Sequence, residues 1–405
     1  MSKKSRAENN GFFIKGGLDI PFLAIVIALI TIGLTMLLSA SYAYCYYYFD
    51  NSLHYFFRQA AFAVGGIAIM FFISHVNYKY LKMFTMIVMA IAMVLLVVVL
   101  FVTPRQGFED FHRWIYLGPI SFQPSEIAKF ALILYLAKDI DRHYIGINSN
   151  RLSENPRLVE FRKTSGLKIR DKSASLVKYL GIIALFAFLV YKENHVSGAL
   201  LLVMLGVFML YLAGYNNKLF LAIGVLGIVA IIAVINNPEI LPAHAQSRIT
   251  SWLDKDFDPR GVRWQTNQAI YAIGSGGFFG VGLGQSKLKQ LYVSEPQNDF
   301  IFSIVCEELG LVGALIIVAL FILLVWRGFV IGIHANDKFG SLLAMGLVFQ
   351  VGLQAALNIG VVTDVLPNTG ISLPFFSYGG TSLLMLIFEM GIVLSISRTA
   401  KLKKA

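Results

Sequence analysis

Residues 300–326 read FIFSIVCEELGLVGALIIVALFILLVW, and this run decides the class of protein. It is longer than the roughly 20 apolar residues that a helix needs to cross a bilayer, and its charged residues are Glu307 and Glu308 alone. The chain of 405 residues is 57% hydrophobic and 14% charged, whereas soluble domains carry about 25% charged residues. We therefore expect an all-α integral membrane protein, and this composition excludes disordered, coiled-coil, collagen-like and disulfide-scaffold chains.

Further charge-poor runs on both sides of this segment predict about ten transmembrane helices. The ten runs are residues 20–49 (in their first two-thirds), 59–77, 83–104, 121–137, 179–191, 196–215, 219–235, 300–326, 339–363 and 377–397. An even number of spans places both termini on one side of the membrane. The excess of Lys and Arg in the segments on that side predicts that it is the cytoplasm.

This topology divides one membrane domain, residues 1–405, into spans and connecting segments. We expect a cytoplasmic N-terminus over 1–19, a cytoplasmic loop over 138–178, a large extracytoplasmic loop over 236–299 between spans 7 and 8, and a cytoplasmic tail over 398–405. The net charge of +11 is explained by the inner segments, so it does not indicate a nucleic-acid partner. The two cysteines, Cys45 and Cys306, indicate neither a disulfide framework nor a metal site.

Charged residues inside predicted spans are costly in a bilayer and therefore mark candidate functional groups. Glu126 and Lys129 are spaced to share one face of a helix. They form either a structural ion pair or, through Lys129, a contact with an anionic substrate. Asp299, at the outer entrance of span 8, is either a helix N-cap or an acid or base whose pKa burial would raise. Glu307, about two turns further on, is expected to line the cavity below Asp299.

Two glycine-containing segments also stand out. The run over 274–284 is neither a Walker A nor a G-x-G-x-x-G fingerprint, and we interpret it as close-packed backbone that presents Gln285 and Ser286. The segment over 366–382 contains two prolines and three glycines inside an apolar region. Non-helical backbone at membrane depth must be buried in protein or line a cavity, so we predict a re-entrant element. Its Ser377 and the amides of Gly379 and Gly380 suit a phosphate or pyrophosphate.

Four separated motifs resemble those of the SEDS family (shape, elongation, division and sporulation). They are residues 113–115 leading to 122–126 and Lys129; 272–277 with 280–286; 299–302 with 307–310; and 373–374 with 377–380. The run over 280–286 is more similar to the FtsW and SpoVE branches than to RodA. Two departures are present: Gln297–Asn298 stands where the family commonly has His-Thr, and the turn at Glu193–His195 lacks the family's proline, which leaves His195 a weak site candidate.

The resemblance implies a peptidoglycan glycosyltransferase that polymerises lipid II at the outer face of the cytoplasmic membrane. The family's essential acidic residue maps onto Asp299, which implies a general base on the acceptor hydroxyl, with undecaprenyl pyrophosphate as the leaving group. The implied partners are a class B penicillin-binding protein transpeptidase and membrane proteins of the divisome or elongation complex. No cofactor follows with certainty, although a divalent cation such as Mg²⁺ is compatible. The candidate substrate-binding residues are Lys129, Arg113, Trp114, Glu126, Gln123, Ser125, Arg248, Gln285, Ser286, Glu307, Ser377, Gly379 and Gly380.

Two alternatives stay open at this point. A lipid II flippase would also use charges within the membrane. A scaffold without catalytic activity could recruit a transpeptidase. The position of Asp299 at the outer end of its span favours chemistry at the outer surface over both.

Overall fold

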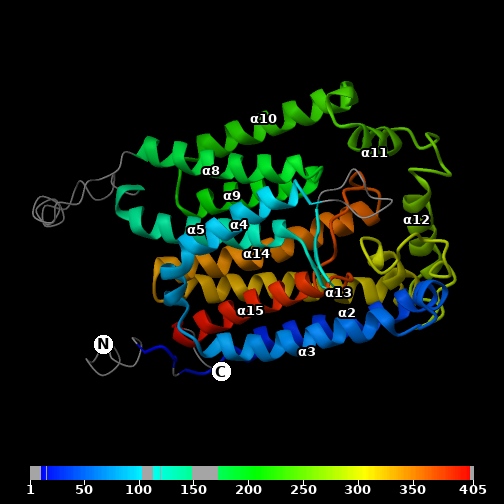
Figure 1. Ribbon diagram of the computed structural model, residues 1–405, viewed down its shortest axis with the longest axis horizontal. Helices are drawn as coiled ribbons and strands as arrows, with labels where there is room; N and C mark the ends of the chain where they lie inside the picture. The colour runs from blue at the N-terminus through cyan, green and yellow to red at the C-terminus, as the bar shows by residue number, and fades with distance from the viewer. Residues whose placement is uncertain (1–10, 15, 103–112, 119, 148–171, 402–405) are drawn as a thin grey trace, which may run out of the picture.

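The computed structural model describes residues 11–14, 16–102, 113–118, 120–147 and 172–401. Within these residues, ten long helices coincide with the ten predicted spans (Figure 1). They are α2 (Ile20–Phe49), α3 (His54–His75), α4 (Leu81–Val99, preceded by the 3-10 turn Tyr78–Tyr80), α5 (Pro124–Ile147), α8 (Lys172–Lys192), α9 (Val196–Leu212), α10 (Asn217–Asn236), α13 (Ile301–Ile333), α14 (Lys338–Val362) and α15 (Gly380–Thr399).

The predicted all-helical membrane fold is confirmed. Eight of the described helices are long and apolar enough to cross a membrane, and α9 is a shorter apolar helix. α5 carries Glu126, Lys129 and a charged C-terminal end. The number of membrane crossings stays a prediction.

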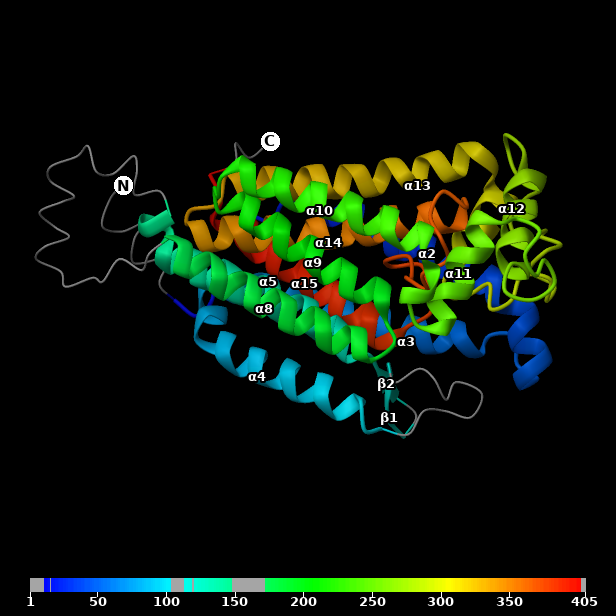
Figure 2. The ribbon, with the colours of Figure 1, turned by 90° about the horizontal axis from the view of Figure 1, so that it is seen from above.

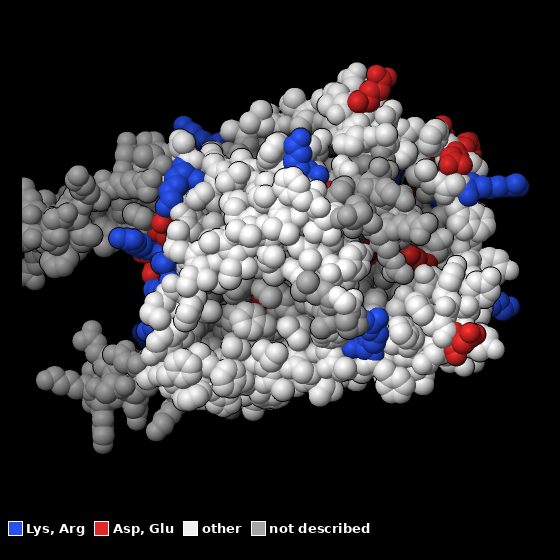
Figure 3. Space-filling model, in the orientation of Figure 1, with Lys and Arg blue, Asp and Glu red and all other residues white. Residues whose placement is uncertain are grey.

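The bundle has a buried centre, and the helices at its edges expose apolar side chains. In the most apolar stretch of α14 and in that of α15, 67% of the residues are buried, whereas none are buried in the corresponding stretch of α10. α10 lies along one edge of the bundle and α3 along the opposite edge (Figure 1). On the face drawn in Figure 3, most charged side chains lie toward the two ends of the molecule, and the area between them carries few, as expected of a protein surrounded by hydrocarbon.

The helices extend further into the predicted cytoplasmic loop than the sequence indicated. α5 continues to Ile147 and α8 begins at Lys172, because charged residues can prolong a helix beyond the apolar layer. The Nζ atom of Lys178 donates a hydrogen bond to Oδ1 of Asp139 at 2.8 Å, which joins the two helix ends. Residues 148–171 of this loop, with 1–10, 15 and 402–405 of the terminal segments, lie outside the described residues.

Two short helices occupy the predicted large outer loop between α10 and α13. They are α11 (Ala243–Leu253), after the 3-10 turn Pro238–Ile240, and α12 (Trp264–Gly276). Both lie at the end of the bundle opposite to the one where α2 begins and α15 ends (Figures 1 and 2). A small antiparallel hairpin, β1 (Ile115–Leu117) with β2 (Ile120–Phe122), precedes α5; no pattern in the sequence predicted it.

The segment between α14 and α15 is non-helical and buried, in agreement with the predicted break in the helices. Leu373, Phe375 and Phe376 are each no more than 3% exposed. A Cβ on Gly33 of α2 would lie 2.3 Å from the carbonyl oxygen of Phe375. Only glycine at position 33 therefore allows the segment to pack this closely against α2.

Candidate active site

Three charged side chains from distant parts of the chain converge on Gly370, in the segment between α14 and α15. A Cβ on Gly370 would lie 3.5 Å from Oδ2 of Asp299, 3.7 Å from Nη1 of Arg113 and 3.7 Å from Nη1 of Arg248. Gly370 has a φ of +70°, a conformation that glycine adopts at little cost. The backbone here therefore comes close to all three groups without a side chain between them.

Hydrogen bonds fix the backbone around Asp299 to the same segment. The Nδ2 atom of Asn358, on α14, donates to the carbonyl oxygens of Asp299 and Ile371 at 2.7 Å each. The hydroxyl of Ser377 donates to the carbonyl of Asn298 at 2.8 Å. The amide of Tyr378 donates to the carbonyl of Gln297 at 2.8 Å. These bonds hold the start of α13 and the non-helical segment in one rigid arrangement.

Asp299 itself does not cap the helix that follows it. α13 begins at Ile301, its N-cap residue is Phe300, and no side-chain capping bond is formed. The carboxylate of Asp299 is therefore available for another role. Burial raises its pKa to about 6, Glu295 acts in the same direction, and Arg248 and Arg113 oppose the shift. A carboxyl group with a pKa near 6 suits a general base at neutral pH.

The two arginines reach Asp299 from separate outer elements. Arg113 lies just before β1 and donates through Nη2 to the carbonyl of Asn194. Arg248, on α11, donates through Nη1 to the carbonyl of Asn368 at 3.5 Å. Behind it, Arg263 donates to the carbonyl of Ser251 at 2.5 Å and to Oδ2 of Asp364 at 2.6 Å. These bonds tie α11 to the start of the non-helical segment.

A polar pocket continues inward from Gly370. Its lining residues are Gln123, Ser125, Glu126, Lys129, His195, Gly198, Leu201, Gln354, Gly370, Ile371 and Ser372. Four of the predicted substrate-binding residues are therefore brought together here, and Gly370 connects them to the Asp299 site. His195 and Gln354 also line the pocket. The sequence indicated His195 only weakly and did not single out Gln354, although Gln350, Gln354 and Asn358 recur every four residues along one apolar helix.

Lys129 is paired within this pocket. Its Nζ atom donates to Oε1 of Glu126 at 2.8 Å and to Oε1 of Gln354 at 2.9 Å. The predicted ion pair is therefore present within α5, and the second bond, to Gln354, connects α5 to α14. One ammonium proton remains after these two bonds, so the pairing does not prevent a contact with a substrate.

The turn between α8 and α9 holds another buried carboxyl group. Glu193 is 0% exposed, and neither of its carboxyl oxygens has a hydrogen-bond partner among the described residues. Burial raises the pKa of Glu193 to about 9, against the opposing charge of Arg113. The group is therefore protonated and uncharged at neutral pH.

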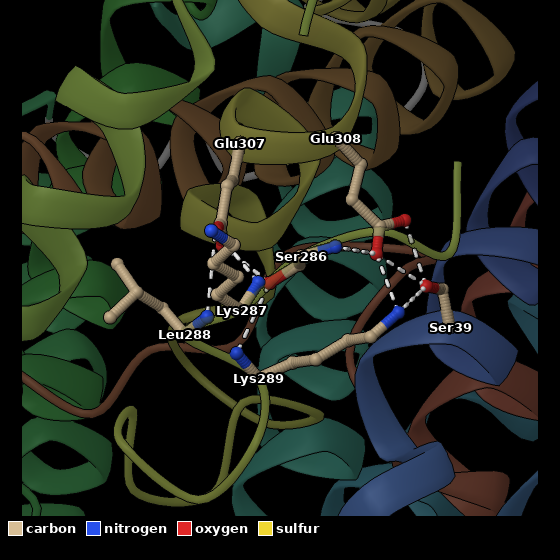
Figure 4. Close-up of polar contacts among 7 residues, drawn as sticks. All are labelled: Ser39, Ser286, Lys287, Leu288, Lys289, Glu307 and Glu308. Carbon is tan, nitrogen blue, oxygen red and sulfur yellow. Dashed lines mark hydrogen bonds and ion pairs between the residues drawn. The ribbon is translucent and has the colours of Figure 1, made fainter. Parts of the chain in front are cut away.

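Glu307 and Ser286 lie in a buried cluster with Glu308 and Lys289 (Figure 4), and Glu307 is not among the residues that line the polar pocket. The Ser286 hydroxyl donates to the Glu307 carboxylate, and the Lys287 amide donates to Oε1 of Glu307 at 3.0 Å. Gln285, next in the chain, is exposed. The expected position of Glu307 assumed one continuous helix, but Asp299 precedes the first turn of α13, so helical spacing does not relate the two residues.

The remaining predicted groups are engaged within the protein. The Gly379 amide donates to Oε1 of Gln59 at 3.2 Å, and the Ser377 hydroxyl binds backbone as described above. Gly380 is the first residue of α15. Trp114 is half-buried beside Arg113. Within the described residues, no group of three or more His, Cys, Asp or Glu side chains is placed to hold a metal ion.

Comparison with known proteins gives one consistent result. The family model named for FtsW, RodA and SpoVE, described as "Cell cycle protein", matches residues 20–402. Stage V sporulation protein E of Bacillus subtilis is 36% identical over 383 residues, which are 95% of this chain and 98% of that protein. The probable peptidoglycan glycosyltransferase FtsW of Trichlorobacter lovleyi is 33% identical over 384 residues, 95% of this chain and 94% of that protein.

Solved structures share the fold. A chain of a peptidoglycan synthase complex, described as coordinating polymerization and crosslinking, matches with a TM-score of 0.71 at 24% identity, covering 94% of this chain and 98% of that one. The rod shape determining protein RodA of Thermus thermophilus matches with a TM-score of 0.62 at 22% identity, covering 96% of this chain and 99% of that one.

Proposed function

The chain belongs to the FtsW, RodA and SpoVE family of cell cycle proteins, and from this premise we propose that it is a peptidoglycan glycosyltransferase that polymerises lipid II. Relatives at 30–33% identity over about 95% of the chain are named as probable enzymes of this kind. The observation that carries the proposal is the convergence of Asp299, Arg113 and Arg248 on Gly370.

In this mechanism Asp299 accepts the proton of the acceptor 4-hydroxyl. The acceptor oxygen forms a bond to the anomeric carbon of the donor sugar, and the bond from that carbon to the pyrophosphate oxygen breaks. The electron pair leaves with undecaprenyl pyrophosphate. Preorganised positive charge stabilises the oxygen on which negative charge develops, which is the role proposed for Arg113 and Arg248. Lys129, deeper in the pocket, adds a third cation.

The site has the acid–base properties that this reaction needs. A carboxylate that bound both arginines tightly would have a depressed pKa and would be a weak base. Burial of Asp299 outweighs the effect of the two arginines, and its pKa lies at about 6. A base of this strength is ionised at neutral pH and still accepts a proton as the acceptor hydroxyl reacts.

We place the reaction at the outer face of the cytoplasmic membrane, in a multi-pass protein with a class B penicillin-binding protein as its transpeptidase partner. The basic residues of the inner segments support this orientation. A related fold within a complex of polymerisation and crosslinking supports the choice of partner.

The test is polymerisation of lipid II by the full chain purified with its transpeptidase partner. Asp299→Asn removes the base and is expected to abolish glycan synthesis while the protein stays folded. Asp256→Asn makes the same chemical change at an exposed position of the outer loop and serves as the matched control. Glycan synthesis by Asp299→Asn at the wild-type rate would refute the assignment. If wild type makes no glycan but moves labelled lipid II across liposomes, the protein is a flippase.

A further inference from the structure

His195 is the best-positioned group in the polar pocket that the proposed mechanism does not use. It is the N-cap residue of α9, it is 7% exposed, and its ring lines the same pocket as Lys129 and Gly370. Its Nε2 atom has no hydrogen-bond partner among the described residues. Buried ring nitrogens are normally hydrogen-bonded, so an unpartnered one in a polar pocket points to a ligand.

The ring's other nitrogen determines which atom carries the proton. The Nε2 atom of the Gln123 amide lies 3.3 Å from Nδ1 of His195. An amide nitrogen can only donate, so Nδ1 is the acceptor. In the neutral imidazole the proton then lies on the Nε2 atom, and the pocket receives a hydrogen-bond donor.

The surroundings keep this ring uncharged. Burial lowers the pKa of His195 well below its usual value, and the positive charges of Arg113, Lys129 and Arg248 lower it further. Glu126, which lines the same pocket, is paired with Lys129, and the neighbouring Glu193 is protonated at neutral pH. The imidazole therefore keeps one proton and does not compete with Asp299 for the proton of the acceptor.

The backbone connects His195 rigidly to the Asp299 site. On the first turn of α9, the Ser197 hydroxyl donates to the carbonyl oxygen of Thr369 at 2.7 Å. Thr369 precedes Gly370, which both lines the pocket and approaches Asp299. The preceding residue, Asn194, accepts the hydrogen bond of Arg113 through its carbonyl oxygen. The short segment from Asn194 to Ser197 thus holds both the His195 ring and the Arg113 side chain in place.

We propose that His195 contacts the substrate directly, donating a hydrogen bond from its Nε2–H to a phosphoryl oxygen of the lipid-linked pyrophosphate. This inference rests on the proposed function. As the bond from the sugar to the pyrophosphate breaks, negative charge grows on the leaving oxygens, and the His195 donor strengthens its hydrogen bond to them. The proton of the acceptor hydroxyl goes to Asp299, and His195 keeps its own. A second unpartnered pocket atom, the hydroxyl oxygen of Ser125, is available to the same ligand.

The kinetic test compares His195→Leu with His195→Gln in the lipid II polymerisation assay. Loss of one preorganised donor to a developing oxyanion costs about 10²–10³-fold in kcat, so His195→Leu is expected to fall by that order. His195→Gln retains an N–H donor and is expected to recover part of the loss. If His195→Leu polymerises at the wild-type rate, the assignment of His195 is wrong and the proposed function stands. If the wild type makes no polymer, the proposed function itself fails.

Gly198 offers a perturbation that leaves the imidazole in place. A Cβ on Gly198 would lie 2.6 Å from Nδ1 of His195, so Gly198→Ala must displace the ring. Gly181→Ala, on α8, makes the same change where no atom lies within 4 Å and is the control. We expect Gly198→Ala to lower kcat and to add little further loss in the His195→Leu background, since both changes then act through one ring. Fully additive losses in kcat would contradict the interpretation that Gly198→Ala acts by displacing the His195 ring.

A binding measurement separates ligand contact from a structural role. With ¹⁵N-labelled histidine, the His195 resonances, assigned by their loss in His195→Leu, should show protonated Nε2 and unprotonated Nδ1 at neutral pH. Farnesyl pyrophosphate, a short-chain probe, is expected to shift the Nε2 resonance of wild type. A ring protonated on Nδ1, or an Nε2 resonance that saturating farnesyl pyrophosphate leaves unchanged, overturns the proposal even if the variants are slow.

Discussion

Breaking the buried ion pair between Lys289 and Glu308 should strongly destabilise the outer end of the molecule. The Nζ atom of Lys289 donates to Oε1 of Glu308 at 2.7 Å, and the two side chains are 4% and 0% exposed. The Ser39 hydroxyl donates to the same carboxylate at 2.6 Å, and the Ser286 amide does so at 3.3 Å (Figure 4). The pair therefore joins α2, α13 and the loop that follows α12.

The expected magnitude for Lys289→Met follows from what the substitution leaves behind. Removing one partner of a buried pair costs about 3–5 kcal/mol, because the other charge stays buried and uncompensated. Glu308 retains its bonds from Ser39 and Ser286, which places the expected loss near the lower end, about 3 kcal/mol. Replacing both partners, Lys289→Met with Glu308→Met, removes the buried charge altogether and should recover much of the loss.

The assay is unfolding in mixed micelles by SDS titration, followed by tryptophan fluorescence. Lys287→Met is the control, because the Lys287 side chain is exposed and its bond to Glu307 comes from the backbone. A free energy of unfolding for Lys289→Met within about 0.5 kcal/mol of the wild-type value, the range of ordinary surface substitutions, would refute the expected loss. So would a double variant whose loss of unfolding free energy equals the sum of the two single losses, because that would mean no coupling between the partners.

Three further predictions concern the candidate site. A general base works when deprotonated, so with a pKa of about 6 for Asp299 the polymerisation rate should rise as pH increases through 6 and level off above it. Glu295→Gln removes a negative charge that raises this pKa and should move the inflection of the rate–pH profile to lower pH; an unmoved inflection would assign it to another group. Gly370→Ala puts a Cβ at positive φ, 3.5 Å from Oδ2 of Asp299; we expect a stability loss of about 1–2 kcal/mol and a much larger loss of rate, whereas parallel losses would point to unfolding. Lys129→Ala should raise KM for lipid II in a folded protein, measured by polymerisation at varied lipid II concentration beside a melting curve, and a chain that no longer folds would assign Lys129 to the structural ion pair.

The order of helices followed from local sequence. Each long apolar run became a helix, because in hydrocarbon a backbone must satisfy its hydrogen bonds internally. The non-helical segment before α15 was predictable for a related reason, since prolines and glycines interrupt an otherwise apolar region. Asp299, Glu126 and Lys129 were found through their charge, since charged groups are rare in such segments and stand out against them, whereas Arg113 was found only through the family resemblance.

Contacts between distant segments could not be obtained in this way. Glu307 was expected in the cavity because helical spacing was extended to Asp299, but α13 begins only after that residue. The Gly379 amide was expected to be free for a phosphate, yet Gln59 of α3 binds it. In both cases a segment distant in sequence supplies the hydrogen-bond partner: the loop after α12 for Glu307 and α3 for Gly379. A local sequence pattern does not contain that information.

The linear chain was thus sufficient for the membrane class, the helix positions and the short set of costly charges, because burial in lipid acts on each segment separately. The tertiary structure decided how those charges combine. It placed Arg113, Arg248 and Asp299 around Gly370, and it placed His195 in the pocket that Lys129 also lines. These arrangements join residues far apart in sequence through packing and long-range hydrogen bonds, and only the folded chain brings such groups within reach of one another.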